Sequence, residues 1–259
     1  MSHFRAGPAP LAQIVSGNPA LKKGTDGDSV RWHSPASKIY FDASLDNAGK
    51  HAREAVQLGF GTWIGSGAKL PSLNFDSTTG AKFGQLPNGK SEVMYGPITL
   101  AGHENDLALT VTFSDPKTGE VVESDMIFNS KHPYGVLPYS PMSIAQSASI
   151  GNSSGCDQKY DLQSVATHEA GHFFGLGEDL VEHQATMFQS IAHCETHKRV
   201  LALTDVSAVT TLYAKSADPE EAKAGARACS FGRAPASEGA LAVSAGILAL
   251  SLLRRRRAR

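Results

Sequence analysis

The segment HEAGHFFGLGED, residues 168 to 179, holds the residues that decide both the fold and the chemistry of this chain. On an α-helix, His168 and His172 lie one turn apart on the same face, so both imidazoles can reach a single zinc ion at about 2.0–2.1 Å. Glu169 projects beside them, where it can take a proton from a water that zinc has activated. The spacing therefore predicts a hydrolytic metal site with Glu169 as the general base.

The third zinc ligand is expected ten residues after the first histidine. Gly175 permits a sharp turn out of the helix, and this turn brings residue 178 back over the metal. The residue at that position is Glu178, and a carboxylate is a competent zinc ligand beside two histidines. Asp179 is the alternative ligand if the loop is shifted by one residue.

The extended string HExxHxxGxxE resembles the metzincin metalloproteases, and among them the matrixin-like branch. The segment ATMFQS, residues 185 to 190, adds to the resemblance, because Met187 matches the methionine turn beneath the metal in that family. Further similarity lies in RWHSPASKIYFD, SDMIFN and LALTDVSAVTTLY, so the resemblance covers roughly residues 30 to 214. Matrixins usually have histidine where this chain has Glu178, and the chain departs from their pattern there.

The resemblance implies an α+β catalytic domain of α/β-like character, with a twisted, mostly parallel five-stranded sheet and about three helices. It also implies a zinc-dependent endopeptidase that holds protein or peptide substrates extended along an edge strand. Structural calcium is common in matrixin-like domains, and the resemblance allows it here. The sequence contains no calcium-binding motif from which its ligands could be predicted. Two alternative functions remain: a catalytically silent surface protein that uses the metzincin fold for binding, and a zinc hydrolase of non-peptide amides.

Periodicity and turn residues predict the elements that precede the histidine segment. KIYFD, residues 38–42, alternates as a half-buried strand does, and residues 46–60 show helical spacing. DLALTVTF at 106–113 and EVVESDMIFN at 120–129 predict a hairpin. The stretch from 65 to 102 is rich in Gly and Pro, which predicts loops and edge strands.

Two further helices follow from capping residues and spacing. The helix that carries the histidines is predicted to begin after Asp161, whose side chain can cap it, and to end near Gly175. A last helix is predicted over residues 203–213, with Thr204 as its N-cap and Asp205 in its first turn.

The three cysteines are Cys156, Cys194 and Cys229, and none has the CxxC spacing of a cysteine zinc site. Cys156 and Cys194 lie on either side of the HEAGH segment, so a disulfide between them is expected if the protein is exported. Two unpaired thiols are the alternative. Cys229 stands apart in the C-terminal region.

Residues 229–259 show a tripartite pattern of a Cys-Ser motif at Cys229, an apolar run over residues 239–253, and the cluster RRRRAR. The run is slightly shorter than the roughly 20 residues of a membrane-spanning helix, but flanking arginines can extend it. The pattern resembles the C-terminal sorting signals of bacterial surface proteins, in particular the myxosortase type. The resemblance implies export, a membrane helix, cleavage near Cys229 and a location at the cell surface or outside the cell.

The remaining segments set the expected domain boundaries. Residues 1–29 contain several Pro and Gly residues and predict a loose leader or arm, without an apolar stretch long enough for a signal peptide. Because export requires such a signal, we expect the natural start to lie further upstream. Residues 30–214 are the predicted catalytic domain, and residues 215–228 are a polar linker.

The formal net charge of −1 conceals an asymmetry along the chain. Residues 229–259 hold six arginines and one acid, which leaves 18 basic and 24 acidic residues on the remainder, a net charge of −6. Nucleic-acid binding depends on clustered Lys and Arg, so no nucleic-acid partner is expected. One core is expected at this length. We also expect the protein to be a monomer.

Overall fold

A computed structural model describes residues 2–6, 29–83, 87–138 and 156–214 of the chain. These ranges belong to one unit that ends at Ala214. The linker, the apolar run and Cys229 of the sorting-signal pattern lie outside the described residues. Within the described ranges, no helix has the length and apolar character needed to cross a membrane.

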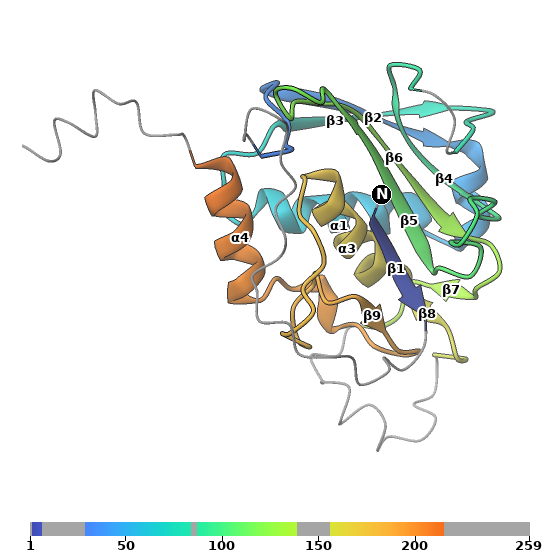
Figure 1. Ribbon diagram of the computed structural model, residues 1–259. Helices are drawn as coiled ribbons and strands as arrows, with labels where there is room; N and C mark the ends of the chain where they lie inside the picture. The colour runs from blue at the N-terminus through green and yellow to red at the C-terminus, as the bar shows by residue number, and fades with distance from the viewer. Residues whose placement is uncertain (1, 7–28, 84–86, 139–155, 215–259) are drawn as a thin grey trace, which may run out of the picture. The chain divides into compact units, whose positions relative to one another are not determined.

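Five strands form the predicted sheet, in the order β3-β2-β4-β6-β5 (Figure 1). They are β2 (Ala36–Asp42), β3 (Ser72–Thr78), β4 (Ser91–Gly96), β5 (Ala108–Ser114) and β6 (Val121–Asn129). β2 pairs in parallel with β3 and β4, and β4 pairs in parallel with β6. β5 is antiparallel to β6, so both the mostly parallel sheet and the predicted hairpin are confirmed.

Two further strands extend the sheet beyond β5. β1 (Ser2–Ala6) pairs antiparallel with β5 and parallel with β9 (Ser190–Ile191). A short separate ladder joins β7 (Tyr134–Gly135) to β8 (Tyr160–Asp161). Residues 2–6 thus differ from the loose leader predicted over residues 1–29, because backbone pairing at a sheet edge requires no particular side-chain pattern.

The described part of the chain contains three α-helices: α1 (Ala52–Ile64), α3 (Leu162–Phe173) and α4 (Leu203–Tyr213). Two short 3-10 helices, η1 (Ala43–Ala48) and η2 (His197–Arg199), lie between these elements. α1 and α3 pack side by side on one face of the sheet (Figure 1). Gly59 permits this close approach, since a Cβ atom there would lie 2.8 Å from the backbone nitrogen of Thr167.

Two local predictions need correction. The helix predicted over residues 46–60 is divided into η1 and α1, because the chain turns at Gly49 and His51, where φ is 143° and 64°. The stretch from 65 to 102 was expected to hold loops and edge strands only. β3 is such an edge strand, but β4 lies inside the sheet, where both Val93 and Met94 are buried.

Apolar layers cover both faces of the sheet. The larger layer lies between the sheet and the helices, and the smaller one on the opposite face consists of Met94, Ile98, Leu109, Val111 and Ile127. Successive side chains of β5 alternate between these layers. Leu109 and Val111 therefore enter the smaller layer, whereas Ala108 and Thr110 face the helices and bring β5 to the histidine segment.

Candidate metal centre

The helix that carries the histidines is fixed at its first residue. Asp161 is its N-cap, and the side chain accepts a hydrogen bond from the backbone N–H of Ser164 at 2.9 Å, which confirms the predicted cap. Arg199 donates to both oxygens of the same carboxylate, with Nε 2.7 Å from Oδ2 and Nη2 2.5 Å from Oδ1. Because Asp161 is fully buried, this two-point ion pair sets the start of α3 firmly.

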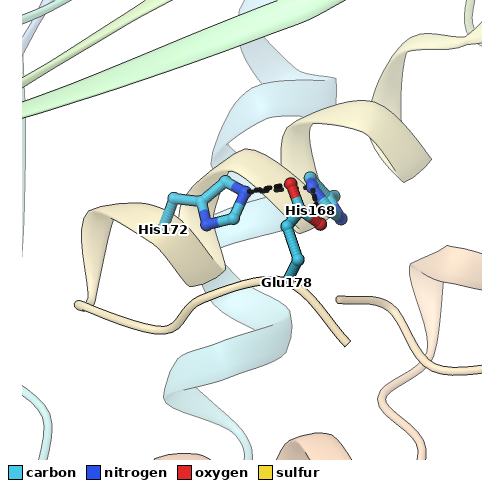
Figure 2. Close-up of side chains that lie close together, drawn as sticks. All are labelled: His168, His172 and Glu178. Carbon is cyan, nitrogen blue, oxygen red and sulfur yellow. Dashed lines mark hydrogen bonds and ion pairs between the residues drawn. The ribbon is translucent and has the colours of Figure 1, made fainter. Parts of the chain in front are cut away.

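His168 and His172 lie on one face of α3, and both are buried (Figure 2). Nδ1 of His168 lies 2.7 Å from the carbonyl oxygen of Thr186, and Nδ1 of His172 lies 2.9 Å from that of Leu176. A carbonyl only accepts hydrogen bonds, so each Nδ1 carries a proton, and in the neutral imidazole Nε2 is then the atom whose lone pair can bind a metal. The two Nε2 atoms are 3.1 Å apart.

Glu178 completes the cluster from the loop after α3 (Figure 2). Its Oε1 lies 3.4 Å from Nε2 of His172, and its Oε2 lies 3.6 Å from Nε2 of His168. Neither oxygen has a hydrogen-bond partner among the described residues. Tetrahedral zinc ligands at about 2.0–2.2 Å lie roughly 3.3 Å from one another, so the donor atoms present fit a zinc ion.

No other group of three His, Cys, Asp or Glu side chains in the described ranges brings its ligand atoms within 4.8 Å of one another. The structure thus draws together the three residues predicted from the sequence, and their role as ligands stays a prediction. Asp179, the alternative ligand, is engaged elsewhere. Its Oδ1 accepts the N–H groups of Val181 and Glu182 at 2.8 and 3.0 Å, so the geometry favours Glu178.

The turn predicted at Gly175 is present and directs Glu178 over the histidines. Gly175 has a φ of 98°, a left-handed conformation that glycine adopts without strain. Its N–H donates to the carbonyl of His172 at 2.9 Å, and the N–H of Leu176 donates to that of Gly171 at 3.0 Å. A Cβ atom on Gly175 would overlap the carbonyl oxygen of Val30.

Met187 lies beneath the histidines, where the family resemblance places the methionine turn. Its side chain is fully buried, and its sulfur occupies the space that a Cβ atom on Gly171 would need. Asp205 holds the turn, since Oδ1 accepts the N–H of Met187 at 3.1 Å and Oδ2 accepts that of Thr186 at 2.7 Å. The sequence shows Asp205 only as a first-turn residue of the last helix, and its link to the site was missed.

The same carboxylate corrects the predicted start of α4. The N-cap is Ala202, whose N–H donates to Oδ2 of Asp205 at 2.8 Å. Thr204 was predicted as the N-cap, and this is wrong because Asp205 reaches back and satisfies the N–H one turn earlier. α4 therefore begins at Leu203, as the spacing predicted, but its N-cap is Ala202 and not Thr204.

The carbonyl that orients His168 receives a second donor. Lys198 is fully buried, and its Nζ lies 3.1 Å from the carbonyl oxygen of Thr186 and also donates to the carbonyl of Phe188. Burial lowers the pKa of Lys198 to about 7, although the nearby carboxylates of Glu178 and Asp205 oppose this shift. Lys198 thus ties both ends of the methionine turn together, which the sequence did not indicate.

Glu169 is fully buried next to the histidines, and its two oxygens differ in their surroundings. Thr110 Oγ1 of β5 donates to Oε2 at 2.6 Å, whereas Oε1 has no partner in the described part of the chain. Burial raises the pKa of Glu169 to about 8, and the electrostatic interaction with His172 and the Thr110 hydrogen bond oppose this shift. The role of Thr110 could not be predicted from the sequence. The alternation of side chains along β5 shows only that Thr110 faces away from the apolar layer of Leu109 and Val111.

The electrostatics of the cluster suit a cation. Burial lowers the pKa of His168 to about 4. Burial acts in the same direction on His172, but the nearby carboxylate of Glu178 raises its pKa. Burial works to raise the pKa of Glu178, and the two histidines nevertheless hold it well below its usual range. At 3.4 and 3.6 Å the contacts of Glu178 are too long for strong hydrogen bonds, and they leave the carboxylate facing Nε2 of both histidines.

Cys156 and Cys194 form a disulfide, with their Cα atoms 5.5 Å apart. It joins the segment before α3 to the segment after β9, where the N–H of Cys194 also donates to the carbonyl of Lys159 at 3.0 Å. This is the pair expected from the sequence. Both chain segments that flank the candidate metal centre are thereby connected covalently.

Comparison with known proteins identifies relatives of this chain. Residues 44–214 match the family described as Matrixin. A solved structure described as "Structure of Myroilysin" aligns with a TM-score of 0.30 and 14% sequence identity, covering 82% of this chain and 98% of that chain. The search of curated proteins found no match.

Replacing Gly175 tests the turn that places Glu178. We expect Gly175→Ala to lower the free energy of unfolding by on the order of 3 kcal/mol, because the left-handed backbone and the Val30 carbonyl both oppose a Cβ atom. The matched control is Gly61→Ala in α1, where a Cβ atom meets open space and should stabilise by roughly 0.5–1 kcal/mol. Urea denaturation of both variants measures the difference, and equal stability would contradict the role of Gly175.

Proposed function

The chain belongs to the matrixin family, and we propose that it is a zinc-dependent endopeptidase that hydrolyses protein or peptide substrates. The convergence of His168, His172 and Glu178 beside the buried Glu169 carries this proposal. A silent binding protein would have no chemical use for a general base held in this position.

The residues divide the chemistry between them. Zinc, when bound by the two histidines and Glu178, supplies a Lewis acid that polarises a substrate carbonyl and makes a water more acidic. Glu169 takes the proton from the water at Oε1, because Thr110 already occupies Oε2. The raised pKa of Glu169 lets it hold this proton and then pass it to the leaving nitrogen.

The backbone orients the reacting side chains. The carbonyls of Thr186 and Leu176 accept the Nδ1 protons of His168 and His172, which directs both Nε2 atoms to the same point. Asp205 and Lys198 in turn fix the segment that carries Thr186. The site therefore needs little rearrangement before it binds its metal.

We also propose that the enzyme acts outside the cytoplasm, at the cell surface or in the surrounding medium. The disulfide between Cys156 and Cys194 supports this location, because such bonds persist in oxidising compartments. The sorting-signal pattern of residues 229–259 points the same way. Detection of the protein in cell fractions and medium tests the location, and an exclusively cytoplasmic pool with reduced Cys156 and Cys194 would contradict it.

Three variants test the zinc site and the base. We expect Glu178→Gln to weaken zinc binding strongly, whereas Asp179→Asn, a matched change at the neighbouring residue, should leave it close to that of the unaltered chain. Glu169→Gln should keep its zinc and lose hydrolysis of an unstructured protein such as casein by about 10²–10⁴-fold. Metal content after dialysis and the rate of casein cleavage measure these effects.

The silent-binding alternative predicts a different result for the same proteins. In that case the unaltered chain binds zinc but cleaves no more casein than Glu169→Gln does. Loss of zinc in Asp179→Asn but not in Glu178→Gln would instead move the third ligand to Asp179.

A further variant tests how the base is held. Thr110→Val keeps the size of the side chain but removes the hydroxyl that binds Oε2 of Glu169. We expect kcat to fall by about tenfold or more, since a hydrogen bond to a buried charged group contributes roughly 1.5–3 kcal/mol. KM and zinc content should change little, and Thr110→Ser should restore most of kcat. A Thr110→Val enzyme with unchanged kcat would remove Thr110 from this role.

A further inference from the structure

Lys198 is a buried lysine close to the candidate metal centre. It lies in η2, which packs against α3, and its side chain is fully buried. Its Nζ donates to the carbonyls of Thr186 and Phe188 and lies 5.6 Å from the centroid of the Phe188 ring. A fully buried lysine is rare, because removing its charge from water costs free energy.

A single carbonyl oxygen connects Lys198 to the predicted zinc ligand His168. The carbonyl of Thr186 accepts from Nδ1 of His168 at 2.7 Å and from Nζ of Lys198 at 3.1 Å. The ammonium group therefore lies beside the ring that offers Nε2 to the metal. A second, charged donor also draws electron density from the shared carbonyl, which makes Nε2 of His168 a weaker zinc donor.

The charge of Lys198 also acts on Glu178, the predicted anionic ligand. Burial lowers the pKa of Lys198 to about 7, and Glu178 is the carboxylate that opposes this shift most. A zinc ion bound by Glu178 would be a second cation near the same carboxylate, and like charges repel in a buried site. The other titratable groups around Lys198 come from α3, the loop after it, the η2 segment and α4: His168, Asp179, Glu195, His197 and Asp205.

We propose that Lys198 limits the zinc affinity of the centre by placing a positive charge on the carbonyl that orients His168, beside Glu178. Lys198 is a positioning residue, because it acts on the metal through its charge and through Thr186 and not as a ligand. The carboxylate of Glu178 strengthens zinc binding, and Lys198 offsets part of this gain. This inference rests on the zinc centre of the proposed function but does not depend on hydrolysis.

The turn around Thr186 can keep its shape without the ammonium group. The N–H of Thr186 donates to Asp205, and its Oγ1 donates at 3.2 Å to the carbonyls of residue 198 and of Val200. These bonds do not involve the side chain at position 198. Lys198→Met therefore removes the charge, keeps an unbranched side chain in the buried space and leaves Thr186 held.

Competition for zinc between the full chain and a chelator tests the proposal at about pH 6, where Lys198 carries its proton. We expect Lys198→Met to bind zinc about tenfold more tightly, because a lysine that must release its proton opposes the metal by about tenfold for each pH unit below its pKa. Loss of a purely structural contact would weaken zinc binding instead. Lys159→Met, the same change at a partly exposed lysine, should match the unaltered chain.

The effect has a definite dependence on pH. Lys198 is charged below its pKa and neutral above it, so the advantage of Lys198→Met should shrink as the pH rises and be lost near pH 8. Arginine keeps its charge throughout this range. We therefore expect Lys198→Arg to bind zinc less tightly than the unaltered chain at about pH 8.

A second measurement needs no substitution. Coupling between two binding events is reciprocal, so zinc must lower the pKa of Lys198 if Lys198 opposes zinc. The ¹³C resonance of Lys198 Cε, followed against pH with and without saturating zinc, measures this change. We expect zinc to move the titration downward by about one pH unit or more.

The outcomes separate this proposal from the proposed function. Equal or weaker zinc binding at about pH 6 in a Lys198→Met chain with an unchanged melting temperature would overturn the proposal. An unchanged titration of Lys198 on zinc addition would also overturn it, and this result decides if Lys198→Met does not fold. The expected shifts in chains that cleave no casein would support the role of Lys198 and overturn the peptidase function. Absence of zinc binding in every chain would overturn both.

Discussion

Two imidazole nitrogens that both carry lone pairs lie 3.1 Å apart, shielded from water, and the rest of the domain is built to hold them there. Two neutral imidazoles in this arrangement repel one another, and the carboxylate of Glu178 adds a buried negative charge whose oxygens lack hydrogen-bond partners in the described residues. Burying an unpaired charge costs several kcal/mol, which a cation at this point would offset. The backbone carbonyls of Thr186 and Leu176 prevent the imidazoles from turning away from one another.

The frame around this contact uses donors from distant parts of the chain. Trp63 of α1 donates through Nε1 to the carbonyl of Thr167 at 2.6 Å, and Trp32 donates to that of Phe173 at 2.8 Å. Tyr213, the last residue of α4, donates to the carbonyl of Phe174 at 2.9 Å. The final carbonyls of a helix have no partners within the helix, so Trp32 and Tyr213 satisfy the end of α3, while Trp63 holds its middle. A metal site on a helix that moved could not keep its ligand spacing.

The sequence predicts those parts of the site that depend on local spacing. His168 and His172 lie on one face because they are one helical turn apart. Glu178 lies over them because the chain reverses at Gly175. Contacts across long separations could not be predicted in this way: Thr110 and Glu169 lie 59 residues apart, and Asp205 acts on a turn 18 residues earlier. The fold shows the same division, since the hairpin of β5 and β6 has a local signal. β1 has no such signal in its sequence, because any extended segment can pair with an open sheet edge through its backbone.

Asp205 has a further consequence for the order in which the protein becomes functional. The methionine turn depends on a carboxylate that lies 18 residues further along the chain, in the last helix of the described unit. A nascent chain that has emerged only as far as Met187 already contains both histidines, Glu169 and Glu178, but lacks the group that holds the turn beneath them. The hydrolytic site is therefore completed only when the domain itself is complete, and a partly synthesised chain carries the motif without its supporting turn.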